Sequence, residues 1–419
     1  MAGTDRTAPE LSAAAPASRP GTGAASSLLT PQFAAVALAM LAYFTGDGVL
    51  IAAVPRYVAG PLGAGNVTVG LVVGAFSLSA FFLRPWVGRL GDRRGRRPLM
   101  VVGAGMFAVS VLGYGLASDP TMLGLLRLFT GAGEAFFFVG AATAATDLAP
   151  PERRGEAMSL ASLSLYVGIG LGPLLGELTI ERFGFAVAWL LAASLGALAL
   201  AVAMRTPETR PARLPEAAAA AAAAHRLVHP AGIAPGLLLL ASLLGMAGFL
   251  AFVPLYALDL GMAGSSGVLL VFAGMVVGIR SFGARIPDRV GPARATRWAL
   301  ALSAAGLGTA GVWQSPAGLY AGAAVLGAGV ALLTPSVFAL AISAVAPQER
   351  GAVIGTASAF LDLAFGLGPA LLGLVAAALD RPGTFLAGAA VAALGLVLVV
   401  ATGYGRAPNA RTRATPMTE

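Results

Sequence analysis

The sequence has no cysteine, no lysine, only two histidines and few charged side chains. Charged residues make up 11% of its 419 residues, whereas hydrophobic residues make up 57%. Without cysteine, the chain can form no disulfide, no thiol nucleophile and no thiolate metal site. The two histidines, His225 and His229, lie in one polar segment with no further ligand nearby, so we expect neither a metal site nor a cofactor.

Two further absences narrow the class of protein. The sequence has no Gly-Lys-Ser/Thr loop of the kind that binds nucleotide phosphates, which excludes ATP as a direct energy source. No catalytic triad can be assembled within the apolar runs, so we do not expect an enzyme. The net charge is +8, but the arginines gather in alternate loops. This distribution is typical of a chain oriented in a lipid bilayer, and it argues against a nucleic-acid partner.

Twelve apolar runs separate the charged loops, and about 20 residues suffice for a helix to cross a bilayer. We therefore predict an all-α integral membrane protein with twelve transmembrane helices in two pseudo-symmetric six-helix bundles. The expected helices cover approximately residues 33–54, 67–87, 98–117, 122–145, 158–179 and 185–204, then 236–258, 267–282, 298–313, 317–344, 353–377 and 385–404.

The predicted bundles occupy residues 32–204 and 234–404, joined by a polar linker over residues 205–233. Residues 1–31 and 405–419 are expected to form cytoplasmic tails, the first of them disordered. The arginine-rich loops, the linker and both tails fall on one side, and the positive-inside rule makes that side cytoplasmic. We predict a monomer that crosses the inner (cytoplasmic) membrane many times, with both termini in the cytoplasm.

The two halves repeat one unit. Residues 88–97 read Gly-Arg-Leu-Gly-Asp-Arg-Arg-Gly-Arg-Arg, and residues 284–294 hold a degenerate copy; the aspartates give an offset of 288 − 92 = 196. The offset persists over about 90 residues, which indicates duplication. It matches Arg84 with Arg280, Gly95 with Gly291, and Gly172-Pro173 with Gly368-Pro369, but it sets Arg127, Glu134 and Asp362 against Ala323, Val330 and Tyr166.

The stretch over residues 88–97 resembles the loop between helices two and three in the major facilitator superfamily. Two further motifs resemble that family: Arg127-x-x-x-Gly131-x-Gly133, whose arginine is implicated in proton transfer, and the drug–proton antiporter signature Gly168-x-x-x-Gly172-Pro173-x-x-Gly176. The signature normally closes with two glycines, whereas this chain has Glu177 in the second place. The resemblance implies two six-helix bundles that rock about a central site, which opens alternately to either side.

The resemblance also implies a gate at the cytoplasmic surface, formed by Gly88, Asp92, Arg93, Gly95, Arg96 and Asp147. Asp92 is expected to approach the helix that starts near Gly351 when that side is shut, because the positive end of a helix dipole favours an anion. Arg96 is expected to pair with Asp147. The alternative is that the arginines only fix the topology of the chain.

Ionisable residues within the apolar runs need a partner, a wet cavity or a function, because a charge in hydrocarbon is costly. Five stand out: Asp47, Arg84, Arg127, Glu134 and Asp362. Arg127 and Glu134 lie seven residues apart, on one helix face and about 10 Å apart along the axis. We expect Glu134 to carry the proton with Arg127 and Asp47 as coupling residues; the alternative is a permanent Arg127–Glu134 pair.

We expect the substrate cavity to be lined by Tyr43, Phe44, Asp47, Glu134, Phe137 and Asp362. The alternatives are packing for the aromatic residues, a helix cap for Asp47, and an ion pair with Arg84 or Arg280 for Asp362. Glu177 lies near the outer end of its helix, where we expect it to be solvated.

The favoured function is export of a small amphipathic or hydrophobic compound, such as a drug or secreted metabolite, in exchange for protons. The alternative is proton-coupled uptake of a sugar or a small organic acid. The spans are poor in the Asn, Gln and Trp residues that sugar sites use, and an organic anion would need a second deep cation besides Arg127. A membrane sensor without transport is a third possibility, which the short tails disfavour.

Overall fold

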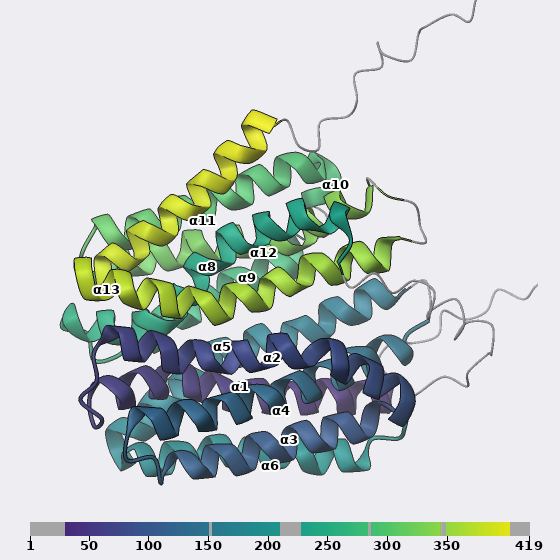
Figure 1. Ribbon diagram of the computed structural model, residues 1–419, viewed down its shortest axis with the longest axis horizontal. Coiled ribbons are helices and arrows are strands. Elements are labelled where there is room, and N and C mark those ends of the chain that lie inside the picture. The colour runs from purple at the N-terminus through teal and green to yellow at the C-terminus, as the bar shows by residue number, and fades with distance from the viewer. Residues whose placement is uncertain are drawn as a thin grey trace, which may run out of the picture.

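The computed structural model describes residues 30–150, 153–209, 228–283, 286–343, 345 and 349–402, which form helices joined by short turns (Figure 1). The first half comprises α1 (Pro31–Ala59), α2 (Asn66–Arg94), α3 (Arg96–Tyr114), α4 (Pro120–Asp147), α5 (Arg154–Phe183) and α6 (Phe185–Arg205). The second comprises α8 (Pro230–Asp259), α9 (Ser266–Phe282), α10 (Ile286–Val290), α11 (Pro292–Val312), α12 (Pro316–Ser343) and α13 (Arg350–Thr402). The expected tails and most of the expected linker lie outside the described residues.

The described helices are consistent with twelve membrane passes. Nine are long and apolar enough to span a bilayer, among them α13, and α9 is a shorter apolar helix. The backbone of α13 leaves helical geometry at Leu379 and Asp380, which divides it into two passes. Counting α13 twice and adding α9 and α11 gives twelve. Large apolar side chains such as Phe82 and Leu116 are exposed on the outside of the bundles, as lipid contact requires.

The chain is arranged as two bundles that lie side by side, α1–α6 in purple to teal and α8–α13 in green to yellow (Figure 1). They meet mainly where α2 packs against α13 and α5 packs against α9. A Cβ built on Gly70 of α2 would lie 2.1 Å from the carbonyl oxygen of Pro369, and one built on Gly74 would lie 2.3 Å from that of Gly366. The backbones of α2 and α13 therefore touch directly.

The start of α4 follows from its local sequence. Pro120 opens α4 at a position where its missing N–H costs nothing. The carboxylate of Asp119 accepts hydrogen bonds from the backbone N–H groups of Thr121 and Met122 at 2.9 and 3.0 Å, which caps the helix.

The basic stretch over residues 88–97 is helical for most of its length, so the expectation of a loop there was wrong. Helix α2 continues to Arg94 and α3 starts at Arg96, so Gly95 alone separates them. Gly95 has φ 103°, a left-handed conformation that glycine adopts without a steric penalty. Arginines in the last turn also suit the negative end of the helix dipole. Similarly, α1 passes through Pro55 and ends at Ala59.

The helices alternate between two ends of the molecule. We call one the Gly95 end; it carries the α2–α3 turn and the ends of α4 and α6. We call the other the Gly184 end; it carries the α5–α6 turn, the α8–α9 turn and the break in α13.

Candidate functional site

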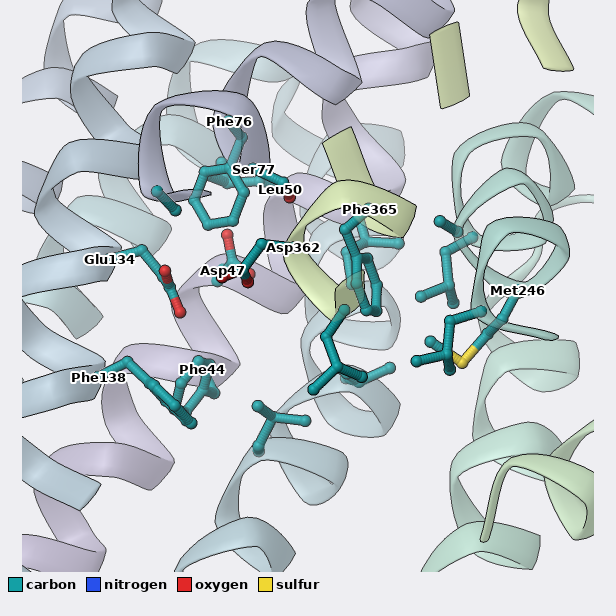
Figure 2. A pocket seen from close by; sticks show the side chains of 18 of the residues that line it. Phe44, Asp47, Leu50, Phe76, Ser77, Glu134, Phe138, Met246, Asp362 and Phe365 are labelled. Atoms are coloured by element: carbon teal, nitrogen blue, oxygen red, sulfur yellow. The ribbon is translucent and has the colours of Figure 1, made fainter. Parts of the chain in front are cut away.

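A cavity of about 310 Å³ lies between the two halves, about midway along the helices. Most of its lining is aliphatic or aromatic. Figure 2 shows Glu134, Phe44 and Phe138 on one side and Met246 and Phe365 on the other, with Asp47 and Asp362 between them. Among the described residues, three acidic and three basic side chains line it: Asp47, Glu134, Asp362, Arg84, Arg127 and Arg280. An apolar chamber with a few convergent polar groups is typical of a small-molecule site.

On the cavity wall, Arg84 of α2 binds two buried carboxylates. Its Nη2 donates to Oε1 of Glu134 at 2.8 Å and to Oε2 at 3.0 Å, while its Nη1 lies 2.6 Å from Oδ1 of Asp362. Glu134 and Asp362 are 5% and 8% exposed. Because Glu134 lies on α4 and Asp362 on α13, this ion-paired group connects the two halves.

The partner of Glu134 is therefore Arg84, and the permanent Arg127–Glu134 pair, which was the alternative to a proton carrier, is not among the ion pairs of the described residues. Spacing along α4 could show that Arg127 and Glu134 share a face, but not that α2 crosses between them. The pair between Asp362 and Arg84, one of the alternatives weighed for Asp362, is present.

Arg127 has few polar contacts. Its Nη2 lies 3.5 Å from the carbonyl oxygen of Val73, its Cζ lies 4.6 Å from the centre of the Phe76 ring, and its Nε and Nη1 are buried without a hydrogen-bond partner in the described part of the chain. Asp47 lines the same cavity. Asp47 thus lies on the cavity wall, where it was expected, and Arg127 lines the same cavity.

The aromatic walls differ in part from those expected. Phe44 lines the cavity, but Tyr43 and Phe137 are fully buried inside the first bundle, where their rings stack at 4.1 Å. Phe138 lines the cavity in place of Phe137. Successive helical residues point about 100° apart, so the sequence alone could not decide which of these neighbours faces inward.

The antiporter-like motif holds α5 against α1. A Cβ on Gly168 would lie 2.5 Å from the backbone carbon of Phe44, and one on Gly172 would lie 2.5 Å from the Cα of Gly48. A Cβ on Gly176 would lie 3.0 Å from the carbonyl oxygen of Val49, and Pro173 lies within α5. The glycines therefore allow close helix contact, as small residues do in membrane bundles.

Asp92, Arg96 and Asp147, three of the expected gating residues, form an ion-paired network at the Gly95 end. Nε of Arg96 lies 3.1 Å from Oδ2 of Asp147, as expected, and its Nη1 lies 2.9 Å from Oδ1 of Asp92. Glu208, which the sequence did not single out, accepts from the backbone N–H groups of Arg96 and Arg97. Asp92, Arg96, Arg97 and Asp147 belong to the first half, and Glu208 lies just after α6, in the expected linker. The side chain of Asp92 is 64% exposed, so the structure is not closed around it.

Glu177 joins the halves at the Gly184 end, and the expectation that it is solvated was wrong. Glu177 is 3% exposed. Its carboxylate accepts hydrogen bonds from the N–H and hydroxyl of Ser265, at 2.7 and 2.8 Å, and from the N–H of Ser266, at 2.8 Å. At the same end, on the α2–α13 contact, Nδ2 of Asn66 donates to the carbonyl oxygen of Ala376 at 3.1 Å. The cavity is therefore closed toward this end.

Arg280 of α9 is a second deep cation that the sequence interpretation did not recognise. It lines the cavity, with its Cζ 4.7 Å from the centre of the Tyr166 ring. Its nearest polar partners are the hydroxyl oxygens of Ser162 at 3.3 Å and Tyr166 at 3.4 Å. Among the described side chains, no carboxylate lies within ion-pair distance of it. The repeat offset had already matched Arg280 with Arg84, and that was the signal available.

The fold and the site can be compared with known proteins. The family profile described as Major Facilitator Superfamily matches residues 36–316 and 281–417. The uncharacterised MFS-type transporter STM4428 of Salmonella typhimurium is 27% identical over 87% of this chain and 94% of its own length. Multidrug resistance protein 1 of Bacillus subtilis is 28% identical over 56% of this chain and 61% of its own length.

A solved structure shares the architecture. The human organic anion transporter MFSD10 (TETRAN) superposes with a TM-score of 0.66, covering 88% of this chain and 100% of that one, at 19% identity. At this level of identity the similarity concerns the fold.

Proposed function

Because the chain belongs to the major facilitator superfamily, we propose that it is a secondary active transporter that exports a small amphipathic compound in exchange for protons. The ion-paired group of Arg84, Glu134 and Asp362 carries this proposal, because it lies on the wall of a largely apolar cavity and joins the two halves. Ionisable groups deep in a membrane protein mark substrate and proton pathways. The cavity is formed within one chain, so we propose that the protein works as a monomer.

The proton is proposed to weaken the ion-paired group that connects the halves. While Glu134 and Asp362 are both ionised, Arg84 makes charge-assisted hydrogen bonds to each. Neutralising either carboxylate replaces a charged partner with a weaker neutral one. We assign the proton to Glu134, because its protonation would weaken two contacts with Arg84 at once, and we assign the cross-half connection to Asp362. Proton uptake then weakens the ion-paired group. Entry of a substrate into the cavity favours release of the proton.

The proposed direction follows from charge and conformation. Arginines are concentrated at the Gly95 end, which the positive-inside rule makes cytoplasmic. The contact of Glu177 at the Gly184 end and the exposed Asp92 side chain at the other end support a transporter that faces the cytoplasm. The similarity to Multidrug resistance protein 1 of Bacillus subtilis favours export. In this orientation both termini are cytoplasmic and the chain lies in the inner membrane.

Transport in everted membrane vesicles tests this function. We expect fluorescent amphipathic compounds to accumulate inside when the interior is made acidic, and we expect Glu134→Gln to reduce that accumulation at least tenfold. Asp119→Asn is the matched control, because it makes the same carboxylate-to-amide change at a helix cap, where asparagine caps equally well. Accumulation only in right-side-out vesicles with acid outside would instead identify an uptake symporter. Full gradient-driven transport by Glu134→Gln would remove Glu134 as the proton carrier.

A further inference from the structure

The two halves carry one arginine each at the same repeat position, and both arginines reach the cavity. Arg84 lies on α2 and Arg280 on α9, separated by 280 − 84 = 196 residues, the offset that relates the halves. Both line the cavity wall. Their surroundings can therefore be compared position by position.

The comparison shows that Arg280 lacks the equivalents of both counter-ions of Arg84. Arg84 binds Glu134 and Asp362. The offset gives 134 + 196 = 330 and 362 − 196 = 166, so the matching positions hold Val330, in the second half, and Tyr166, in the first half. The Arg280 guanidinium indeed lies over the ring of Tyr166, at 4.7 Å.

The remaining contacts of Arg280 leave its charge unbalanced. The two hydroxyl contacts, from Ser162 and Tyr166, are long at 3.3 and 3.4 Å, and Nε is buried without a hydrogen-bond partner in the described part of the chain. A neutral hydroxyl and an aromatic face compensate a cation less well than a carboxylate does. A guanidinium presents a planar fork of donors that matches a carboxylate in two-point geometry.

We propose that Arg280 binds an anionic group of the substrate, which supplies the counter-ion that Arg280 lacks among the described side chains. The substrate class is then an amphipathic organic anion, with a carboxylate or sulfonate on Arg280 and an apolar body against Met246, Leu250 and Phe365. This inference rests on the proposed function for the site, and it names the substrate class. It answers the objection that only Arg127 could serve an organic anion. It also suits export, because an interior-negative potential drives an anion outward by about 2.3 kcal/mol per charge per 100 mV.

Binding to the purified full-length protein tests the proposal without a proton gradient. The probes are 2-naphthoate, 2-naphthamide and 2-(aminomethyl)naphthalene, which share a ring and differ in charge, together with aromatic carboxylates from benzoate to pyrenebutanoate. Calorimetry should show the anion binding at least tenfold more tightly than its neutral and cationic counterparts. Arg280→Gln should remove that preference, Arg280→Lys should retain part of it, and Arg182→Gln, at an exposed arginine near the Gly184 end, should leave it unchanged.

A second variant returns a counter-ion instead of removing the cation. Tyr166→Asp places a carboxylate at the first-half position that matches Asp362 of the second half, so Arg280 should pair internally and the anion preference should be lost although Arg280 remains. An arginine that serves only to hold helices together would leave anion binding unaffected by Tyr166→Asp.

The outcomes separate this proposal from the transport mechanism. Arg280-dependent anion binding without proton-driven transport would uphold the anion site and reject proton-coupled export. Proton-driven transport that Arg280→Gln leaves intact would uphold proton-coupled export and reject the anion site. A preference for the amine, or failure of every anion in the series to bind, overturns the proposal.

Discussion

Glu177 of α5 accepts two hydrogen bonds from Ser265, one from its backbone N–H and one from its hydroxyl, across the boundary between the halves. Its second oxygen accepts from the N–H of Ser266, the first residue of α9. A carboxylate at this position satisfies backbone donors that have no partner within the helix and lies at the positive end of the helix dipole. Glu177 therefore fastens the first half to the start of a helix in the second half.

Removing this carboxylate should open the Gly184 end. Charge-assisted hydrogen bonds of this kind contribute about 1.5 to 3 kcal/mol, so Glu177→Ala should shift the closed-to-open ratio at least tenfold. The chain has no native cysteine, so spin labels can be introduced directly at Phe183→Cys and Leu379→Cys, both exposed at this end. Electron-resonance distance measurements should show longer distances in Glu177→Ala. The control is Glu181→Gln, an exposed carboxylate one turn further along α5; unchanged distances in Glu177→Ala would contradict the fastening role.

The ion-paired group should behave as a unit in stability measurements. Arg84→Gln leaves Glu134 and Asp362 buried without their cation, and breaking a buried pair in this way costs about 3 to 5 kcal/mol. The triple variant Arg84→Gln, Glu134→Gln, Asp362→Asn carries no charge at these positions and should recover most of that loss. Thermal unfolding in detergent measures both. If the triple variant is as unstable as the sum of its single changes, the three residues do not act together.

Asp92→Asn should leave the protein inserted in the membrane but slow transport. In this structure the exposed Asp92 carboxylate pairs with Arg96, and we expect it to contact α13 only in the conformation closed at the Gly95 end. The amide removes the charge that the helix terminus would favour. Transport per inserted molecule is the measurement, with Asp119→Asn as the control. A normal rate in a correctly inserted Asp92→Asn variant would rule out the gate.

Gly131→Ala should destabilise the first bundle. A Cβ on Gly131 would lie 1.8 Å from the carbonyl oxygen of Phe76, so α2 and α4 would have to separate. Overpacking of this kind costs about 1 to 3 kcal/mol. Gly105→Ala is the matched control, since a Cβ there meets nothing within 4 Å and alanine favours a helix more than glycine does. Equal thermal stability of the two variants would contradict the close contact.

The fold could be predicted because it depends on features that are visible in the linear sequence. Apolar runs, alternate charged loops and a constant repeat offset are sufficient to indicate a helical membrane protein made of two similar halves. The residues of the ion-paired group could be named for the same reason, since a charge inside an apolar run is visible in the sequence.

The partners of those residues could not be predicted, because they depend on how helices cross. Arg84 reaches Glu134 from another helix, and one-helix spacing carries no information about that. The rotation of α4 decides between Phe137 and Phe138, and it is set by packing with its neighbours. Glu177 was misjudged because its position near a helix end indicates solvent, whereas the start of α9 covers it.

The main-chain contact between α2 and α13 at Gly70 and Gly74 has a consequence for motion. At these two glycines the closest contacts are with backbone atoms of α13, so the bundles can roll against each other at this point without forcing rotamers past one another. Arg94 lies 20 residues beyond Gly74 on the same helix, roughly 30 Å away along the axis. A small rotation about the glycine contact therefore produces its largest displacement at the opposite tip of α2, next to the arginine-rich turn.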